Sequence, residues 1–277
     1  FPTRRSSDLY TSCDGVMVPA TTQAEKDKRR QTVMQWRRET PRKKRGPLKR
    51  LRAVKKGADQ RYKQVYVSIF YDQSQEHRLV GVTRGEVKGL QSLLKRQAER
   101  VVLLDAAERV EIVDGAVCLK STLEMLPLRE IVLDFYHHSE HVGEAAVATL
   151  GLEPAGDRSW LSQSLHTVRH EGYAPFFQKL LDWRTKLRGG KRAAANALIG
   201  YVAPRQSMIR YDQCDLHGWN MGSGPMESMC GVTTDHIKGR GRRWDLDNAE
   251  SLMALEALYQ STGQWDRYWS NALIHPN

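Results

Sequence analysis

The chain has 277 residues, 40% of them hydrophobic and 27% charged, with a formal net charge of +11. This is enough for one large domain or two small ones with a real core, and it excludes an intrinsically disordered chain. The sequence contains no CxxC pair, no run of eighteen apolar residues and no charged-then-apolar leader, so we expect a cytoplasmic protein without a disulfide framework, membrane span or signal peptide.

The first nine residues, FPTRRSSDL, resemble the read-through translation of a sequencing adaptor. We therefore leave residues 1–9 out of the fold prediction and expect the natural sequence to begin near Tyr10, without its upstream part. From Tyr10 to Val18 the chain is rich in β-forming residues and is interrupted by Asp14-Gly15. This stretch predicts a strand whose end carries a carboxylate.

The positive charge is concentrated in residues 25–63, which hold 17 Lys and Arg against 4 Asp and Glu, a balance of +13. The rest of the chain holds 26 basic and 28 acidic residues, a balance of −2. Such a segment is typical of a surface that binds a polyanion and releases its counterions. A solvated basic linker is the alternative. Within it, Thr40–Arg50 is broken by Pro and Gly and predicts a loop or short helices.

Alternating and helical patterns follow in a regular order. Two β-branched runs around a polar turn predict a hairpin, and apolar residues at helical spacing predict a helix after it. Further strands, one ending in Asp114-Gly115, precede a long helical region and a loop. The predicted elements are a hairpin at Gln64–Tyr71 and His77–Thr83, helix Glu86–Val101, strand Arg109–Leu119, a short helix at Ser121–Leu126, strand Glu130–Phe135, helices over 140–201, a loop at 213–224, helix Asn248–Tyr259, and a last helix with Trp265 and Trp269.

This order predicts an α/β fold, a mixed sheet flanked by helices with an all-helical insertion. We divide the chain into a first core part at residues 10–139, the insertion at 140–212, and a last core part at 213–277.

Three acidic residues stand where this topology can bring them together. Asp14 and Asp114 each precede a glycine at a predicted strand end, and Glu227 follows the corner "GSGPMES" at the start of a helix. If the two strands are neighbours, the carboxylates meet at one end of the sheet, and two Mg²⁺ ions would relieve their repulsion. The simpler alternatives are that Asp-Gly is a turn, and that Pro and an acid merely start a helix.

The chain resembles bacterial insertion-sequence transposases of the DDE type, which have an RNase H-like fold, in the group close to the Mutator-like and Kra-type elements. The resemblance covers almost everything from Tyr10 to Trp269. The stretches that carry it are "CDGVMVP", "IVDGAVCL", "IVLDFYHHSEHV", "GSGPMESMC" and "IKGRGRRW…GQWDRYW".

The resemblance implies that Asp14, Asp114 and Glu227 are catalytic residues and ligands of two Mg²⁺ or Mn²⁺ ions. It implies DNA strand cleavage and strand transfer at insertion-sequence ends, double-stranded DNA at both transposon ends and target, and a homo-oligomer near the bacterial nucleoid. Two alternatives stay open: a catalytically inactive DNA-binding remnant, and an RNase H-like nuclease.

The segment "LDFYHHSEH" adds Asp134 and His137, which the resemblance places behind the catalytic carboxylates as supporting residues. A zinc site that includes His141 is an alternative, but it lacks a nearby cysteine pair. A hydrogen-bonded structural histidine under the sheet end is the other alternative.

Two basic segments are candidates for DNA contact through phosphate binding and, for the tryptophan, base stacking. The tryptophan is expected to be mostly a core residue. The candidate DNA-binding residues are Arg42, Lys43, Lys44, Arg45, Lys49, Arg50, Lys238, Arg240, Arg242, Arg243 and Trp244.

Overall fold

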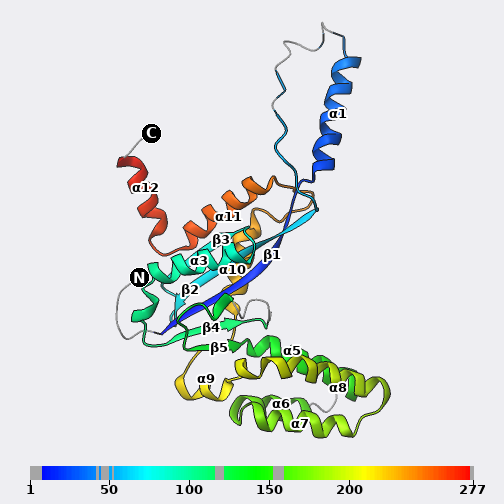
Figure 1. Cartoon of the computed structure of the whole chain (residues 1–277), viewed down its shortest axis with the longest axis vertical. Coiled ribbons are helices and arrows are strands. Elements are labelled where there is room, and N and C mark those ends of the chain that lie inside the picture. Colours follow the sequence, from blue (N-terminus) through cyan, green and yellow to red (C-terminus); the bar gives the residue numbers. More distant parts are fainter. Residues whose placement is uncertain are drawn as a thin grey trace.

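The computed structural model describes residues 8–41, 44, 50–51, 53–115, 122–151 and 159–274. A twisted sheet forms the centre, helices cover it, and a helical bundle lies at one end (Figure 1). None of the helices in the described part has the length and apolar character needed to cross a bilayer.

The sheet has five strands in the order β3-β2-β1-β4-β5. β1 and β2 pair antiparallel, as do β2 and β3, whereas β1, β4 and β5 run parallel to one another. The predicted mixed α/β sheet is therefore confirmed. The strands are β1 (Leu9–Pro19), β2 (Tyr62–Asp72), β3 (Arg78–Thr83), β4 (Arg109–Val113) and β5 (Glu130–Leu133).

Helices α1 and α3 lie between strands in the chain, and from α5 onward the helices follow one another without a further named strand. They are α1 (Gln23–Glu39), α3 (Val87–Arg100), α5 (Phe135–Leu150), α6 (Ser159–His170), α7 (Tyr173–Thr185), α8 (Gly189–Val202), α9 (Tyr211–His217), α10 (Gly224–Asp235), α11 (Leu246–Gln260) and α12 (Gln264–Ile274), with 3₁₀ turns η1 (Leu103–Asp105) and η2 (Ala203–Met208).

Helices α3 and α10 cover opposite faces of the sheet. The hydroxyl of Ser68 on β2 donates to Gln97 of α3. Asp14, which pairs with the neighbouring Val67, receives a contact from Cys230 of α10. Because successive residues of a strand point to opposite faces, these two contacts lie on opposite sides. Both faces of the strands are therefore buried, which explains their nearly continuous apolar runs.

The bundle α5–α9 packs around its own apolar residues, among them Phe176, Leu180 and Leu198, and it joins the sheet where η2 contacts β5. Its first helix begins at Phe135, so the boundary predicted between residues 139 and 140 falls inside α5. The loop predicted at 213–224 is wrong over its first residues, which belong to α9. Burial of Tyr211 and Cys214 fixes that short helix, and Gly218 ends it in the left-handed conformation.

The prediction for the first strand is also corrected. β1 begins at Leu9, a buried residue inside the segment assigned to the adaptor, and it runs past Asp14 to Pro19. Gly15 does not turn the chain: it pairs with Tyr66 in the sheet, and a Cβ there would collide with the Gln64 side chain. Gly15 is therefore a residue of the strand and not part of a turn.

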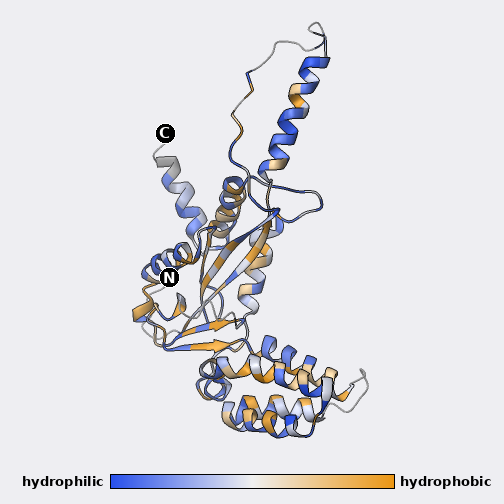
Figure 2. Cartoon of the chain, turned by 45° about the vertical axis from the view of Figure 1, so that its right-hand side comes forward, coloured by the Kyte–Doolittle hydropathy of each residue, from blue (hydrophilic) through white to orange (hydrophobic). Residues whose placement is uncertain are grey.

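None of the residues of the 17-residue helix α1 is buried. It extends away from the body, and its surface is predominantly hydrophilic (Figure 2). Burial of apolar side chains therefore contributes little to holding it in place.

Candidate active site

Three aspartates occupy one row across the parallel strands. Thr11 pairs with Glu111 and Val113 pairs with Leu133. When these registers are continued, Asp14, Asp114 and Asp134 come level with one another on β1 and just beyond β4 and β5. The predicted adjacency of the strands that lead to Asp14 and Asp114 is thus confirmed.

Asp14 is half-buried beneath α10. Burial raises the pKa of its carboxyl, and the negative charge of Asp114 raises it further. The Gly15 N–H, the Cys230 thiol and the charge of Lys238 offset part of this effect on the pKa. The thiol donates to Asp14 Oδ2 over 3.8 Å. These contacts place α10 and the ammonium that follows it close to the Asp14 carboxylate.

The turn after Asp114 is fixed from the helical bundle. Gly115 has a φ of +96°, a conformation that side chains other than glycine rarely adopt. Its carbonyl accepts two hydrogen bonds from the Arg205 guanidinium, Nε at 3.0 Å and Nη2 at 2.6 Å. Arg205 also donates to Tyr201 O at 2.7 Å and lies over the Tyr201 ring. A residue of η2 thereby holds the backbone next to Asp114.

Glu227 lies in the first turn of α10, behind the Gly-Pro corner. Its side chain is exposed, and Ser223 Oγ lies 3.5 Å from its Oε1. Glu227 and Cys230 are three residues apart and so share one face of α10. Burial raises the pKa of Cys230 to about 12, and the charges of Asp14 and Glu227 add to this. The thiol therefore lies in the field of both carboxylates.

Asp134 anchors the segment that leads to Glu227. Its buried side chain accepts hydrogen bonds from the backbone N–H of Ser223 and from that of His137, the latter at 2.7 Å, and so caps α5. Phe135 N donates to Met221 O at 2.8 Å alongside. The corner before Glu227 is thus fixed to the end of β5, and the supporting role of Asp134 in catalysis stays a prediction.

His137 takes part in this arrangement only through its backbone. Its ring instead approaches Glu140 and the ring of His141. The buried histidine is the next residue, His138, which contacts the hydroxyl of Tyr211 at 3.1 Å. Burial lowers the pKa of His138 to about 3. Burial thus applies to His138, a residue that the sequence prediction did not name, and not to His137.

Within the described residues, no three His, Cys, Asp or Glu side chains are close enough to form a ready metal centre. Metal binding by Asp14, Asp114 and Glu227 is therefore a proposal. The two residues that sequence reasoning missed here are Cys230 and Arg205. The first was detectable from its spacing to Glu227 on one helix, whereas nothing in the sequence marks the second.

The four cationic candidate DNA-binding residues after α10 are exposed, whereas Trp244 is partly buried. Lys238, Arg240 and Arg242 are exposed, and Arg242 donates to His236 O. Arg243 donates to Ala20 O at 3.3 Å. Trp244 is partly buried against the core, and its indole N–H donates to Ile237 O at 3.0 Å, in line with the expected core role.

In the other basic segment, Arg42, Lys43, Arg45 and Lys49 lie outside the described residues. Lys44 and Arg50 are exposed.

No protein-family model matches the sequence, and no curated protein matches it. Among solved structures, the chain is similar to the Drosophila P element transposase in its strand transfer complex, with 9% identity and a TM-score of 0.30. The match covers 98% of this chain and 66% of that one, so the chain spans about two thirds of the other's length. A score this low carries no argument about function.

Proposed function

We propose that this chain is the catalytic region of a DDE-type transposase with an RNase H-like core, which cleaves DNA at insertion-sequence ends and transfers the freed strand to target DNA. The observation that carries the proposal is the arrangement of Asp14 and Asp114 at neighbouring parallel strands, with the Glu227 helix packed against β1. The mixed sheet flanked by helices is consistent with that fold.

The donor chemistry fits a pair of hard cations. Asp14, Asp114 and Glu227 supply carboxylate oxygens, the ligands that Mg²⁺ and Mn²⁺ prefer. Burial and the nearby Asp114 charge raise the pKa of Asp14, and a bound cation would favour its ionised form. Two bound ions would supply Lewis-acid stabilisation of charge during in-line phosphoryl transfer.

Other residues of the chain hold the proposed metal ligands and a DNA phosphate in position. Arg205 and Asp134 fix the backbone beside Asp114 and before Glu227. Lys238 adds positive charge next to Asp14, where it would attract a DNA phosphate. The partner is double-stranded DNA, at transposon ends and target. We further propose a homo-oligomeric active complex and a location in the bacterial cytoplasm at the nucleoid.

The test is cleavage of duplex DNA bearing the element's own ends, with Mg²⁺ or Mn²⁺ present. Glu227→Gln keeps the size of the side chain and removes its charge. We expect cleavage to fall by orders of magnitude with unchanged DNA binding, because several kcal/mol of transition-state stabilisation would be lost. Asp235→Asn removes one charge from the exposed far end of the same helix and should cleave at the wild-type rate.

Three outcomes would contradict the proposal. Equal cleavage by the wild type and Glu227→Gln would remove Glu227 from the site. Binding without any cleavage would identify a catalytically inactive remnant. Cleavage that does not depend on the element's ends would identify an RNase H-like nuclease.

A further inference from the structure

The basic arm, by which we mean α1 and residues 53–57, has a rigid root. Ala58 N donates to Thr21 O at 2.9 Å, and Gln23 N donates to Ala58 O at 3.0 Å. Gly57 N donates to the Gln23 side chain at 2.7 Å. A Cβ on Gly57 would lie 2.4 Å from Gln23 N, so the two strands of the root meet at a position that only glycine fits. The arm therefore leaves and rejoins the body at one fixed point.

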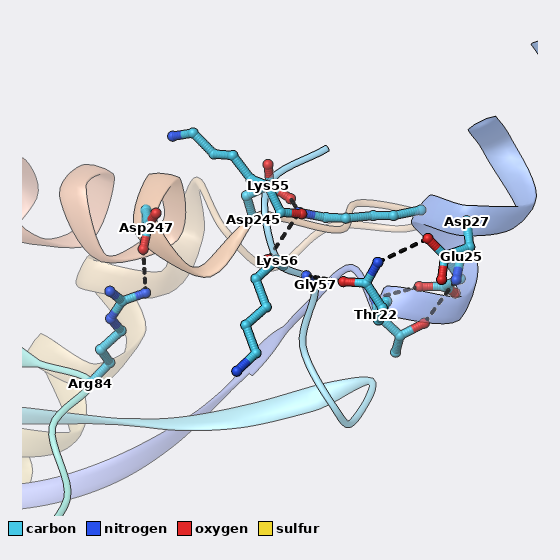
Figure 3. A network of polar contacts seen from close by, with 11 residues as sticks. Thr22, Glu25, Asp27, Lys55, Lys56, Gly57, Arg84, Asp245 and Asp247 are labelled. Atoms are coloured by element: carbon cyan, nitrogen blue, oxygen red, sulfur yellow. Dashed lines mark hydrogen bonds and ion pairs between the residues drawn. The ribbon is translucent and has the colours of Figure 1, made fainter. Parts of the chain in front are cut away.

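The first turn of α1 is fixed in direction as well. Thr22 and Glu25 form a reciprocal capping box, which satisfies helix-start N–H groups. The Lys26 ammonium donates to Lys55 O at 3.0 Å and Lys56 O at 3.3 Å, and it pairs with Asp245 at 2.6 Å. Figure 3 shows this network, with Lys55 and Lys56 extending their side chains in opposite directions. A single lysine thus joins α1, the returning segment at residues 53–57 and the start of α11.

A cleft of about 550 Å³ opens at this root, between the arm and the segment before α11. Five cationic side chains and one carboxylate line it. The charged and polar lining residues are Thr21, Lys26, Arg29, Arg30, Lys55, Arg243, Asp245 and Asn248.

The lining keeps an excess of positive charge after its own ion pairs are formed. Lys26 neutralises Asp245, and Arg243 lies 3.5 Å from Glu25. Arg29 and Lys55 are exposed, and neither has an acidic partner within the described part of the chain. Because Lys26, Arg29 and Arg30 are three and four residues apart, they share one side of α1.

We propose that this root cleft grips the phosphate backbone of duplex DNA and that the DNA continues along α1. The choice of DNA rests on the proposed function, whereas the cleft and its charge do not. α1 has 17 residues and is about 25 Å long, while duplex DNA carries a phosphate charge about every 1.7 Å of its axis. The cleft also joins the two basic segments, since Arg243 and the arm line the same space.

The experiment measures binding of a fluorescein-labelled duplex of random sequence by anisotropy, in EDTA, at salt concentrations from about 50 to 200 mM. The test variant is Arg29→Gln/Lys55→Gln. The control is Lys95→Gln/Arg96→Gln, which removes the same charge from an exposed stretch of α3. We expect the test variant to bind roughly tenfold more weakly or worse near 0.1 M salt, with a log–log salt slope shallower by about two.

Binding by the test variant equal to that of the control would overturn the proposal, as would tighter binding of duplex RNA than of DNA. We expect the test variant to melt like the wild type, because neither side chain is buried. Its loss of DNA binding would then come from the cleft and not from unfolding. Because EDTA removes the divalent ions that DNA cleavage would need, the assay measures DNA binding alone. Loss of DNA binding in the test variant supports the proposal for the root cleft even if no cleavage is ever found. DNA cleavage by a test variant that binds DNA normally would overturn the proposal for the root cleft and leave the proposed function standing.

Discussion

The end of the sheet and the basic arm hold their charged groups in opposite ways. At the sheet end, Asp134 is buried and tied to two backbone N–H groups, and Asp14 is half-buried against α10. In α1 no residue is buried, and its first turn is fixed at the root by the Lys26–Asp245 ion pair. The first arrangement fixes a few groups in position, which chemistry requires. The second presents many charges in water, an arrangement that is sufficient to bind a polyanion.

Among the substitutions that test this contrast, Asp134→Ala is expected to lower the free energy of unfolding the most. The change removes the cap of α5 and leaves the Ser223 N–H without its acceptor. We expect a loss of about 2–4 kcal/mol in the free energy of unfolding. Urea denaturation measures it, and Asp134→Asn, which keeps one acceptor oxygen, should recover part. A loss below that of an ordinary surface change would show that the sheet end does not depend on this anchor.

Gly115→Ala should come next. A Cβ would lie 2.8 Å from Leu133 Cδ1 and 2.9 Å from Arg205 Nε, at a backbone conformation that alanine avoids. We expect destabilisation of about 1–3 kcal/mol, seen as a lower Tm. Gly143→Ala is the matched control, because it lies within α5 with open space around the added Cβ. That variant should instead gain about 0.5–1 kcal/mol.

The buried carboxyl of Glu111, in the sheet, should make the stability of the protein depend on pH. It is fully buried on β4, and no described group forms a well-aligned hydrogen bond with its carboxylate. Burial raises its pKa well above the usual range. The folded state therefore keeps a proton that the unfolded chain releases, so stability falls as pH rises from the unfolded pKa near 4.3 toward the folded one.

We expect this fall to reach at most about 1.4 kcal/mol per pH unit. Glu111→Gln should flatten it, as measured by urea denaturation at several pH values. Glu171→Gln, an exposed control, should leave the profile unchanged. A wild-type profile already flat across the window would mean that the Glu111 carboxyl is not desolvated.

The smallest effect is expected in the arm. Trp36 on α1 is 53% exposed, so Trp36→Ala should change the free energy of unfolding by no more than about 0.5 kcal/mol. Thermal melting provides the measurement. A cost of several kcal/mol would mean that α1 packs against something, such as a second copy of the chain, and would remove the contrast between the two regions.

The sequence by itself determined the mixed sheet, its hairpin, the α3 helix and the concentration of positive charge, because these depend on local periodicity and composition. It also placed Asp14 and Asp114 on strands that prove to be neighbours. The tertiary structure alone decided that β1 continues past Asp14, that residues 213–217 are helical, and that His138 and not His137 is buried. Packing across elements controls each of these, and a period of 2 or 3.6 residues carries no information about it. The same holds for Arg205, whose partner Gly115 is ninety residues away. It also holds for the root cleft, which forms where α1, residues 53–55 and the start of α11 meet.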